Sequence, residues 1–508
     1  MPQAMKLLVI GGVAAGASCA ARARRLCETA EITVLERGPD VSFANCGLPY
    51  HVGGEIPTRD VLAVQTPATL KGLLNLDVRT RCEAVRIDRA GKRVEVKNLV
   101  DGSSEWLSYD KLMLSPGASP IRPPIPGIDD QRIFTLRSLE DMDRVIAATE
   151  AGMRAVAIGA GFIGLEMAEQ LHHKGLSVEL VELQKQVLPQ LDKKMTMLLE
   201  SELRHHEIGV TLGDGIECFV PTPDALECHL KSGKVLKADF VVLSMGVKPD
   251  TQIARDAGLT LGPRGHVVVD HFQRTSDPDI YAAGDAVETE ELVFGDRIAL
   301  PMGGPANRQG RVAADHMLRP GAAHPYPGSL GTAIVRVFDV AAGVTGWTEK
   351  RMRDANKPCA SVIVNDHQHA TYFPGAKPLT LKLVWDTRDG RVVGAQATGG
   401  EGVDKRLDVI AACIQGKATI DDLCHLELAY APPFGSAKDI INLAGFAATN
   451  MRDGLFEQAG ELPFGDAQIV DVRPKPVADA FPLTGAINIP FPTLRANLDK
   501  LDRSKPVI

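Results

Sequence analysis

The chain has 508 residues, which at about 150 residues per domain corresponds to roughly three domains. Hydrophobic residues make up 44% and charged residues 24%, and the 48 glycines and 33 prolines follow no period, so disordered and collagen-like chains are excluded. The 56 basic and 64 acidic residues give a net charge of −8, which argues against a nucleic-acid binder and against a polybasic membrane-surface protein.

The N-terminal residues lead directly into a predicted strand, without a separate apolar segment followed by a small-residue cleavage site. No apolar run reaches the 18 or so residues that a bilayer span needs. We therefore expect a cytoplasmic protein without a membrane span.

The first glycine loop follows an apolar run at residues 6–10 and precedes a helix rich in small residues. This order is typical of a buried parallel strand, a tight turn and a helix N-terminus that offers free N–H groups to a pyrophosphate. Gly11 and Gly16 hold the outer positions of the motif, but Val13 replaces the middle glycine. A second strand ends at Glu36, at the spacing of an acid that binds a ribose hydroxyl, and Arg37 follows it.

The second glycine loop matches G-x-G-x-x-G in full, at Gly159, Gly161 and Gly164. The next predicted strand ends in Glu182, a second candidate for a ribose contact. Such glycines also occur in tight strand-to-helix packing without a ligand, but two loops with two acids favour two bound dinucleotides.

Two shorter signals complete this pattern. A small-residue turn that contains Gly117 suits a crossing between domains, and Gly284-Asp285 follows a short apolar strand. With the two loops, this layout resembles the pyridine nucleotide–disulfide oxidoreductases over residues 5–450. The resemblance implies that the first loop holds FAD, that the second holds NADH or NADPH with Glu166 among the contacts, and that Asp285 contacts the ribityl chain of the flavin.

The same resemblance implies an α/β fold with two doubly wound, Rossmann-like nucleotide-binding domains. The FAD domain is expected at 1–113 and 244–325, the NAD(P) domain at 114–243 and an α+β interface domain at 326–455. The interface domain implies a homodimer in which each subunit completes the active site of the other.

Nine cysteines are present, and none has C-x-x-C spacing, so neither a zinc ribbon nor a thioredoxin-type pair is indicated and we expect no metal. Cys46 differs from the other eight, which we expect to be ordinary buried residues. It lies in Ser42-Phe-Ala-Asn-Cys-Gly-Leu-Pro-Tyr, where the resembled family places its redox cysteine. Val41 and His51 flank it at five residues, so no local disulfide partner exists, and Cys46 is expected to cycle between a thiolate and a mixed disulfide, persulfide or sulfenate.

Two histidines that other members of the family carry are absent, and this reduces the number of members that the chain resembles. Ala14 stands where flavin peroxidases and oxidases of the family carry a histidine, and Ala431 stands where dithiol reductases carry their basic histidine. The remaining pattern resembles the coenzyme A-disulfide reductases, which also have tyrosines that match Tyr372 and Tyr430. A phenol there can protonate the leaving thiolate, with Tyr430 favoured over Tyr372. The alternative is that Tyr430 has no catalytic role and only stacks as an aromatic residue in the interface.

The reaction implied by this resemblance needs a thiolate at Cys46, because a thiol does not attack sulfur, and we expect an oxidised flavin and a helix N-terminus to lower the pKa of Cys46. Coenzyme A brings phosphates, and the arginines of the first helix are suited to bind them, unless they form a solvated helix face. The residues that match the family's coenzyme A contacts are Ser18, Arg22, Arg25, Ser42, Asn45, Asn307 and Lys438, with Lys71 one turn before the aligned Leu74.

The C-terminal segment at 460–508 resembles the opening half of a rhodanese-like domain, on Asp471-Val-Arg and Gly485-Ala-Ile-Asn-Ile-Pro. No cysteine lies beyond Cys424, so this partial domain has no residue to carry a persulfide. We expect the domain to continue beyond residue 508; a degenerate remnant is the alternative. Because a rhodanese partner transfers sulfane sulfur, the segment favours persulfide or polysulfide as a substrate.

The sequence therefore predicts an FAD-dependent NAD(P)H reductase of CoA-disulfide, CoA-persulfide or polysulfide, with NADH preferred because of Glu182. An NADH oxidase or peroxidase that cycles through a Cys46 sulfenate is the alternative within the enzymes. A non-catalytic NADH-sensing or electron-transfer flavoprotein is the alternative from another class.

Overall fold

The computed structural model describes residues 4–460 and 465–508. The chain divides into two compact units, Met1–Phe446 and Ala447–Ile508, which we describe separately. The first unit contains two parallel five-stranded sheets and one antiparallel five-stranded sheet. Across the described ranges, no helix combines the length and the apolar character that a bilayer span requires.

The first parallel sheet has the order β19-β7-β1-β2-β3 and contains the first glycine loop. Its central strand is buried in four of its five residues because it has a neighbour on each side and a layer on each face, which explains its continuous apolar run. The strands are β1 (Lys6–Ile10), β2 (Glu31–Leu35), β3 (Asp77–Arg79), β7 (Lys111–Leu114) and β19 (Ile280–Ala282).

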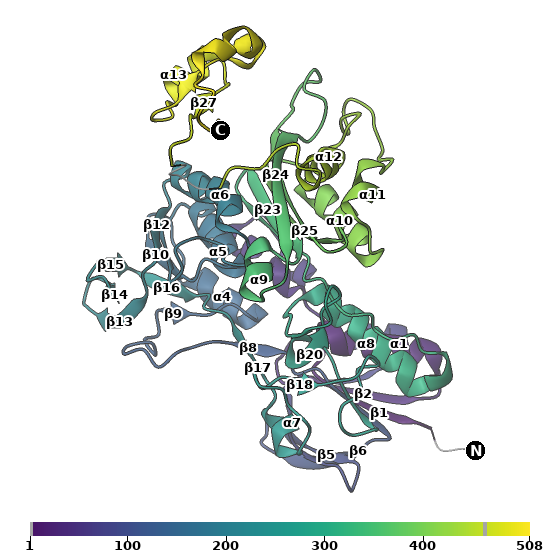
Figure 1. Cartoon of the computed structure of the whole chain (residues 1–508). Coiled ribbons are helices and arrows are strands. Elements are labelled where there is room, and N and C mark those ends of the chain that lie inside the picture. Colours follow the sequence, from purple (N-terminus) through teal and green to yellow (C-terminus); the bar gives the residue numbers. More distant parts are fainter. Residues whose placement is uncertain (1–3, 461–464) are drawn as a thin grey trace. The chain divides into compact units, whose positions relative to one another are not determined.

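Different layers cover the two faces of this sheet. Helices α1 (Ala14–Leu26) and α8 (Gly303–Leu318) lie side by side on one face (Figure 1), where Val9 packs in their shared core. The opposite face packs through Leu8 against a three-stranded antiparallel sheet. Alternate residues of a strand point to opposite faces, so one strand supplies both cores. The smaller sheet consists of β4 (Cys82–Asp88), β5 (Arg93–Asn98) and β6 (Ser104–Ser108).

The second parallel sheet repeats this plan around the second glycine loop, in the order β12-β11-β10-β16-β9. Ala157 packs in one core with α5 (Phe162–His173), and Val156 packs in another with an antiparallel three-stranded sheet. The strands of the parallel sheet are β9 (Ile133–Phe134), β10 (Arg154–Ile158), β11 (Ser177–Glu182), β12 (Gly209–Leu212) and β16 (Phe240–Leu243). The smaller sheet and the other helices of this region are β13 (Ile216–Pro221), β14 (Leu226–Leu230), β15 (Val235–Ala238), α4 (Leu139–Ala147) and α6 (Lys193–His205).

The chain passes between the two parallel sheets through a pair of short antiparallel strands, β8 (Ala118–Pro120) and β17 (Val247–Pro249). The whole second sheet lies between these strands in the sequence. The first parallel sheet is therefore built from two separated stretches of chain, with the second sheet inserted between its strands β7 and β19.

The antiparallel sheet of the first unit has the order β22-β23-β26-β25-β24. Its strand β25 carries Lys382, a buried lysine that donates hydrogen bonds to Asp192 (2.7 Å) and to Glu349 (2.6 Å). Since Asp192 is the N-cap residue of α6, this charge cluster joins the antiparallel sheet to the second parallel sheet and its helices. The strands are β22 (Ala333–Val337), β23 (Val340–Gly346), β24 (Cys359–His367), β25 (Pro378–Asp386) and β26 (Val392–Gly399), with helices α9 (Glu349–Asp354), α10 (Val403–Gln415), α11 (Ile420–Cys424) and α12 (Ile440–Arg452).

Short elements connect these sheets. They are α2 (Leu48–Gly53), α3 (Pro67–Leu74), α7 (Gln252–Asp256), β18 (Val267–Val268), β20 (Val287–Glu290), β21 (Arg297–Ile298) and the 3₁₀ turns η1 (Asn45–Gly47), η2 (Arg59–Leu62), η3 (Gly284–Ala286) and η4 (Pro320–Ala322).

The second unit contains a small parallel pair, β27 (Val470–Asp471) and β28 (Ile487–Asn488), with α13 (Lys475–Ala480) and the 3₁₀ segment η5 (Phe491–Lys500). A parallel bridge between Gln468 and Val507 adds the last residues to this pair. The Asp471-Val-Arg motif forms an ion pair in which Arg473 contacts Asp471 at 2.7 Å. Large apolar side chains remain exposed here, among them Phe481 and Phe491.

Candidate active site

Both glycine loops make turns that only glycine fits. Gly11 and Gly159 have φ values of +90° and +100°, and a Cβ on them would lie 2.0 and 2.4 Å from the carbonyl oxygens of Ser115 and Ser244. Each loop therefore packs directly against the end of a neighbouring strand. Gly164 closes the second loop in the same way, because its Cβ would lie 1.8 Å from the Gly159 oxygen. Gly16 occupies the equivalent place in the first loop, 1.9 Å from the Gly11 oxygen.

Gly161, the middle glycine of the second loop, has a different environment. Within the described part of the chain, no atom beyond its immediate chain neighbours lies within 4 Å of a Cβ built on it, and it precedes α5 without any side-chain cap. The hydroxyl oxygen of Ser244, which lines the cavity next to this loop, is buried and has no hydrogen-bond partner among residues 4–460 and 465–508. Open space at a helix N-terminus beside an unsatisfied hydroxyl fits a dinucleotide pyrophosphate.

The two acids at the strand ends occupy equivalent positions. Glu36 accepts hydrogen bonds from the backbone N–H groups of Gly12 (2.9 Å) and Gly38 (2.8 Å). Glu182 accepts them from Ala160 (2.7 Å) and Gln184 (2.8 Å). The N–H groups fix each carboxylate at the mouth of its loop, where a carboxylate has lone pairs left for a ribose hydroxyl. Arg37 lies beside Glu36, exposed, and contacts Asp250 at 3.7 Å.

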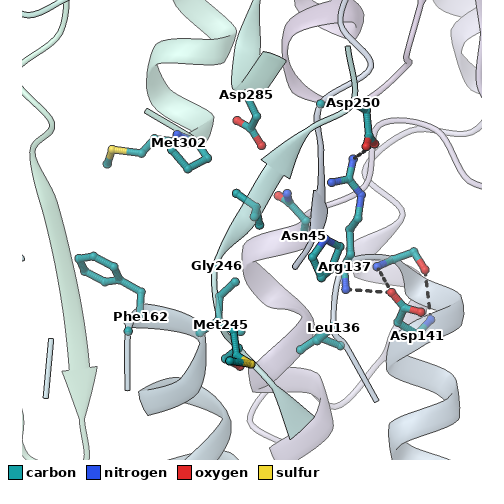
Figure 2. Close-up of a pocket in the computed structure, with 18 of the residues that line it drawn as sticks. Asn45, Leu136, Arg137, Asp141, Phe162, Met245, Gly246, Asp250, Asp285 and Met302 are labelled. Carbon is teal, nitrogen blue, oxygen red and sulfur yellow. Dashed lines mark hydrogen bonds and ion pairs between the residues drawn. The ribbon is translucent and has the colours of Figure 1, made fainter. Parts of the chain in front are cut away.

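A single cavity of about 2260 Å³ extends along both loops. Both strand-end acids line it, together with Gly117, Gly284, Asp285, Cys46 and Glu166. Figure 2 shows Asp285 and Asn45 extending toward the interior of this cavity, with the Arg137–Asp250 contact on one side. Its size and its two glycine cradles fit two extended ligands that meet near Cys46.

Asp285 reaches the cavity from η3, the turn that follows strand β19. Gly284 adopts φ +80° and donates its N–H to Gln309 of α8 (2.8 Å), so the turn is held by the helix. The pKa of the Asp285 carboxyl is raised, because burial raises it by more than the nearby Arg137 lowers it. A half-buried carboxyl at this position suits hydrogen bonding to a polyhydroxyl chain.

Cys46 lies in η1, immediately before the N-terminus of α2, and its sulfur is exposed to the cavity. The groups of the chain raise the pKa of this thiol: desolvation contributes most, followed by the carboxylates of Glu166 and Asp285. The predicted lowering of this pKa, which rests on an oxidised flavin as well as on the helix N-terminus, stays a prediction, whereas the protein groups by themselves act in the opposite direction. Burial contributes most to this opposite shift, and the two acids add to it because like charges disfavour a thiolate.

Tyr372 and Tyr430 lie outside the residues that line this cavity. Both side chains are exposed, at 72% and 49%, and their hydroxyl groups are 2.8 Å apart. The hydrogen bond to Tyr430 raises the pKa of Tyr372. The structure therefore brings the two predicted tyrosines together, but on the surface of the unit.

The predicted coenzyme A contacts fall into two groups. Ser18 of α1 donates to Asn307 of α8 (2.6 Å), and Arg22 pairs with Asp315 of α8 (2.6 Å), so these residues join the two helices. Arg25 is exposed at the end of α1. The remaining predicted contacts lie elsewhere in the unit. Ser42 and Asn45 lie near Cys46 in the chain, and the ammonium group of Lys71 donates a hydrogen bond to the side chain of Asn75 (2.7 Å). Lys438 is exposed and precedes α12.

Two features were missed by the sequence reasoning. Tyr50 donates a hydrogen bond to Glu166 (3.1 Å), and Arg137 lies between Asp250 and the turn at Gly117. Tyr50 was visible at the end of the Cys46 motif, but its partner is 116 residues away. Arg137 lies in no motif, so only its position in the fold identifies it.

Comparison with known proteins identifies the family. The model of the family described as "Pyridine nucleotide-disulphide oxidoreductase" matches residues 5–309, and the model of its dimerisation domain matches residues 332–439. The chain belongs to this family. It is an oxidoreductase with Rossmann-like nucleotide-binding domains and a dimerisation domain.

Three relatives refine this result. Coenzyme A disulfide reductase of Staphylococcus epidermidis is 33% identical over 446 residues, which cover 87% of this chain and 99% of that protein. The crystal structure of reduced Bacillus anthracis CoADR-RHD has a TM-score of 0.94 and 40% identity, over 99% of this chain and 92% of that one. The NAD-dependent persulfide reductase from A. fulgidus has the same TM-score and identity, over 99% and 93%.

Proposed function

We propose that this protein is an FAD-dependent NAD(P)H reductase of CoA-disulfide, CoA-persulfide or polysulfide that works through Cys46. The observation that carries the proposal is the position of one cysteine in a cavity shared by two dinucleotide loops. The likeness to a coenzyme A disulfide reductase and to a persulfide reductase supports it.

The residues present fit both cofactors. We assign FAD to the first loop, with Gly11, Gly16, Glu36 and Asp285 as its main contacts, and the nicotinamide cofactor to the second loop, with Gly159, Gly161, Gly164 and Glu182. The chemistry that FAD supplies is two-electron transfer between a nicotinamide and a sulfur–sulfur bond. The chain itself binds and orients both ligands and supplies the sulfur nucleophile.

In the proposed reaction the Cys46 thiolate attacks a sulfur of CoA–S–S–CoA, a Cys46–sulfur bond forms, and a CoA thiolate leaves. The departing thiolate needs a proton, and a phenol can donate it. We assign this role to Tyr430 of the second subunit of a homodimer, with Tyr372 as its hydrogen-bonding partner. The matched dimerisation domain supports a dimer, and the exposure of both phenols is consistent with their use by another subunit.

The domain assignment follows the same proposal. Residues 1–113 and 244–325 form the FAD domain, 114–243 the NAD(P) domain, 326–455 the interface domain and 460–508 part of a rhodanese-like domain. We assign coenzyme A to the part of α1 and α8 that carries Ser18, Arg22 and Asn307, because these residues and the exposed Arg25 offer donors to phosphate groups.

The purified, FAD-loaded protein tests this proposal under anaerobic conditions. We expect NADH to reduce the bound flavin, and NADH to be consumed with release of thiol or hydrosulfide only after CoA-disulfide, CoA-persulfide or polysulfide is added. In a separate aerobic assay without these acceptors, fast NADH consumption would identify an oxidase instead. Flavin reduction without turnover on any of these acceptors would favour an NADH-sensing or electron-transfer protein.

A further inference from the structure

Helix α2 has Cys46 at one end and an ion pair at the other. Cys46 lies in η1, directly before the helix, and Glu55 follows two residues after the helix ends at Gly53. Glu55 pairs with Arg336 of β22, a strand of the antiparallel sheet. Because α2 has 6 residues and a helix rises about 1.5 Å per residue, a displacement of its Glu55 end also displaces the cysteine end.

Helix α5 holds the C-terminal end of α2 by direct packing. A Cβ built on Gly53 would lie 1.8 Å from the side-chain oxygen of Gln170, so the two helices approach without room for a side chain. The Gln170 side chain is buried and donates a hydrogen bond to Glu55 (2.9 Å). Leu48 and Val52 of α2 are buried in one core with residues of α5. The end of α2 that carries Glu55 is therefore fixed against α5.

Arg336 contacts both helices at this point. Its guanidinium pairs with Glu55 after α2 and with Glu169 of α5 (3.2 Å), and it lies 5.6 Å from the ring centre of Tyr50 in α2. His173 of α5 lies 3.6 Å from the same Glu55 carboxylate. Since the Glu169 side chain is only 1% exposed, loss of its cation would leave an uncompensated buried charge, which keeps Arg336 in place.

The side chains of this cluster lie outside the proposed reaction space. Cys46 lines the large cavity, whereas Arg336, Glu55 and Gln170 do not. Strand β22 itself reaches the cavity through Ile334, two residues before Arg336. One strand thus lines the cavity and holds the helix that follows Cys46, so Arg336 can influence the sulfur chemistry only through α2.

We propose that the Arg336–Glu55 ion pair positions Cys46, so that a strand of the matched dimerisation domain sets the place of the sulfur nucleophile. The inference deepens the proposed function, on which it rests for FAD beside Cys46. Arg336 and Glu55 are positioning residues that act through α2. Their effect is large in rate because misplacement of a reacting group by about 1 Å can cost about a hundredfold.

The test measures the long-wavelength charge-transfer absorbance that a thiolate gives when it contacts an oxidised flavin. FAD-loaded, thiol-reduced enzyme is titrated from about pH 6 to about pH 10, and the amplitude at high pH reports the contact of Cys46 with the flavin. In Glu55→Ala we expect less than about half of this amplitude and a kcat for CoA-disulfide lowered about tenfold. FAD content, the thermal midpoint and KM for NADH should stay unchanged, which a general loss of structure would not allow.

Asp143→Ala is the matched control. Asp143 of α4 accepts hydrogen bonds from Arg59 of η2 at 3.0 and 2.9 Å, so this ion pair holds the segment after α2 instead of α2 itself. The side chains of the pair are 38% and 45% exposed, against 45% and 35% for Arg336 and Glu55. Asp143→Ala should keep the full amplitude. Equal losses in Asp143→Ala and Glu55→Ala would overturn the inference.

Removal of the cation tests the same ion pair from the other side. Arg336→Met alone leaves the buried Glu169 carboxylate unpaired, so Arg336→Met/Glu169→Gln is used to avoid that cost. This variant should lose as much amplitude as Glu55→Ala, and Glu55→Ala added to it should cause no further loss. A full further loss would mean that Glu55 acts without Arg336 and would overturn the inference. If the Arg336 variants do not fold, Glu55→Ala and its control decide.

The absorbance separates this inference from the proposed function. Loss of amplitude in Glu55→Ala, in an enzyme that reduces none of CoA-disulfide, CoA-persulfide and polysulfide, would refute the proposed function and leave the positioning of Cys46 standing. Normal turnover with an unchanged amplitude in Glu55→Ala would do the opposite. If the unaltered enzyme shows no such absorbance at any pH, the inference is wrong, and turnover alone decides the proposed function.

Discussion

The hydroxyl groups of Tyr372 and Tyr430 are 2.8 Å apart although 58 residues separate them in the chain. The buried Arg406 links the two chain segments that carry these tyrosines, because it donates to the carbonyl oxygen of Gln368 (2.8 Å) and to Asp439 (2.7 Å). This buried ion pair restrains the segments on which the two exposed phenols lie.

Tyr430→Phe removes one hydroxyl from this pair and should leave FAD content and dimerisation intact. If the phenol protonates the leaving thiolate, turnover of the sulfur substrate should fall about a hundredfold. Stopped-flow measurement of thiol release checks this.

In a purified mixed dimer of Tyr430→Phe and Cys46→Ser subunits, one site carries both changes and the other carries neither, so activity should return to about half that of the unaltered dimer. No recovery would mean that Tyr430 acts within its own chain or not at all.

Cys46→Ser should abolish reduction of the sulfur substrate while NADH still reduces the flavin, because the change is nearly isosteric and removes only the nucleophilic sulfur. Cys82 provides the control, since it lines the same cavity, and Cys82→Ser should keep its activity. Anaerobic assays with CoA-disulfide compare the two variants. Activity above a few per cent in Cys46→Ser would remove this residue from the mechanism.

Gly161→Ala should weaken NADH binding without loss of stability. The site has room for a methyl group and its φ of −78° suits alanine, but that methyl group would occupy the space assigned to the pyrophosphate. We expect KM for NADH to rise at least about tenfold, a loss of about 1.4 kcal/mol, with FAD retained. Gly164→Ala is the contrasting variant: its Cβ would lie 1.8 Å from a backbone oxygen, so its thermal midpoint should fall as well.

Glu182→Ala should reduce the preference for NADH over NADPH. The carboxylate is held by two backbone N–H groups at the mouth of the second loop, where it would bind a 2′-hydroxyl and repel a 2′-phosphate. The ratio of kcat/KM for the two cofactors measures the effect. Glu179, on the same strand but outside the cavity lining, provides a control whose substitution by alanine should leave that ratio unchanged. A preference for NADPH in the unaltered protein would contradict the assignment.

Lys382→Met should destabilise the protein by about 3–5 kcal/mol, because it leaves the buried Asp192 carboxylate and Glu349 without their cation. Urea unfolding followed by circular dichroism measures the loss. Lys350→Met, which breaks the exposed pair with Asp354, should change the stability by less than about 1 kcal/mol. Similar losses in the two variants would show that burial of Lys382 is not the cause.

The sequence by itself determined the local parts of this protein. An apolar run, a turn that only glycine can make and a helix start are encoded by neighbouring residues, so both loops and their strand-end acids Glu36 and Glu182 could be located without a structure. The Cys46 segment could also be located from local sequence, because its pattern consists of nine consecutive residues, 42–50.

Only the tertiary structure decided which distant groups act together. The Tyr50–Glu166 hydrogen bond, the Tyr372–Tyr430 pair and the Lys382 cluster each join segments between 33 and 190 residues apart, and no local pattern encodes such distances. The direction of the Cys46 pKa shift likewise depended on burial and on Glu166 and Asp285, which lie far from Cys46 in the chain. Electrostatic effects follow separation in space and access to water, and both are set only when the sheets pack around a common cavity.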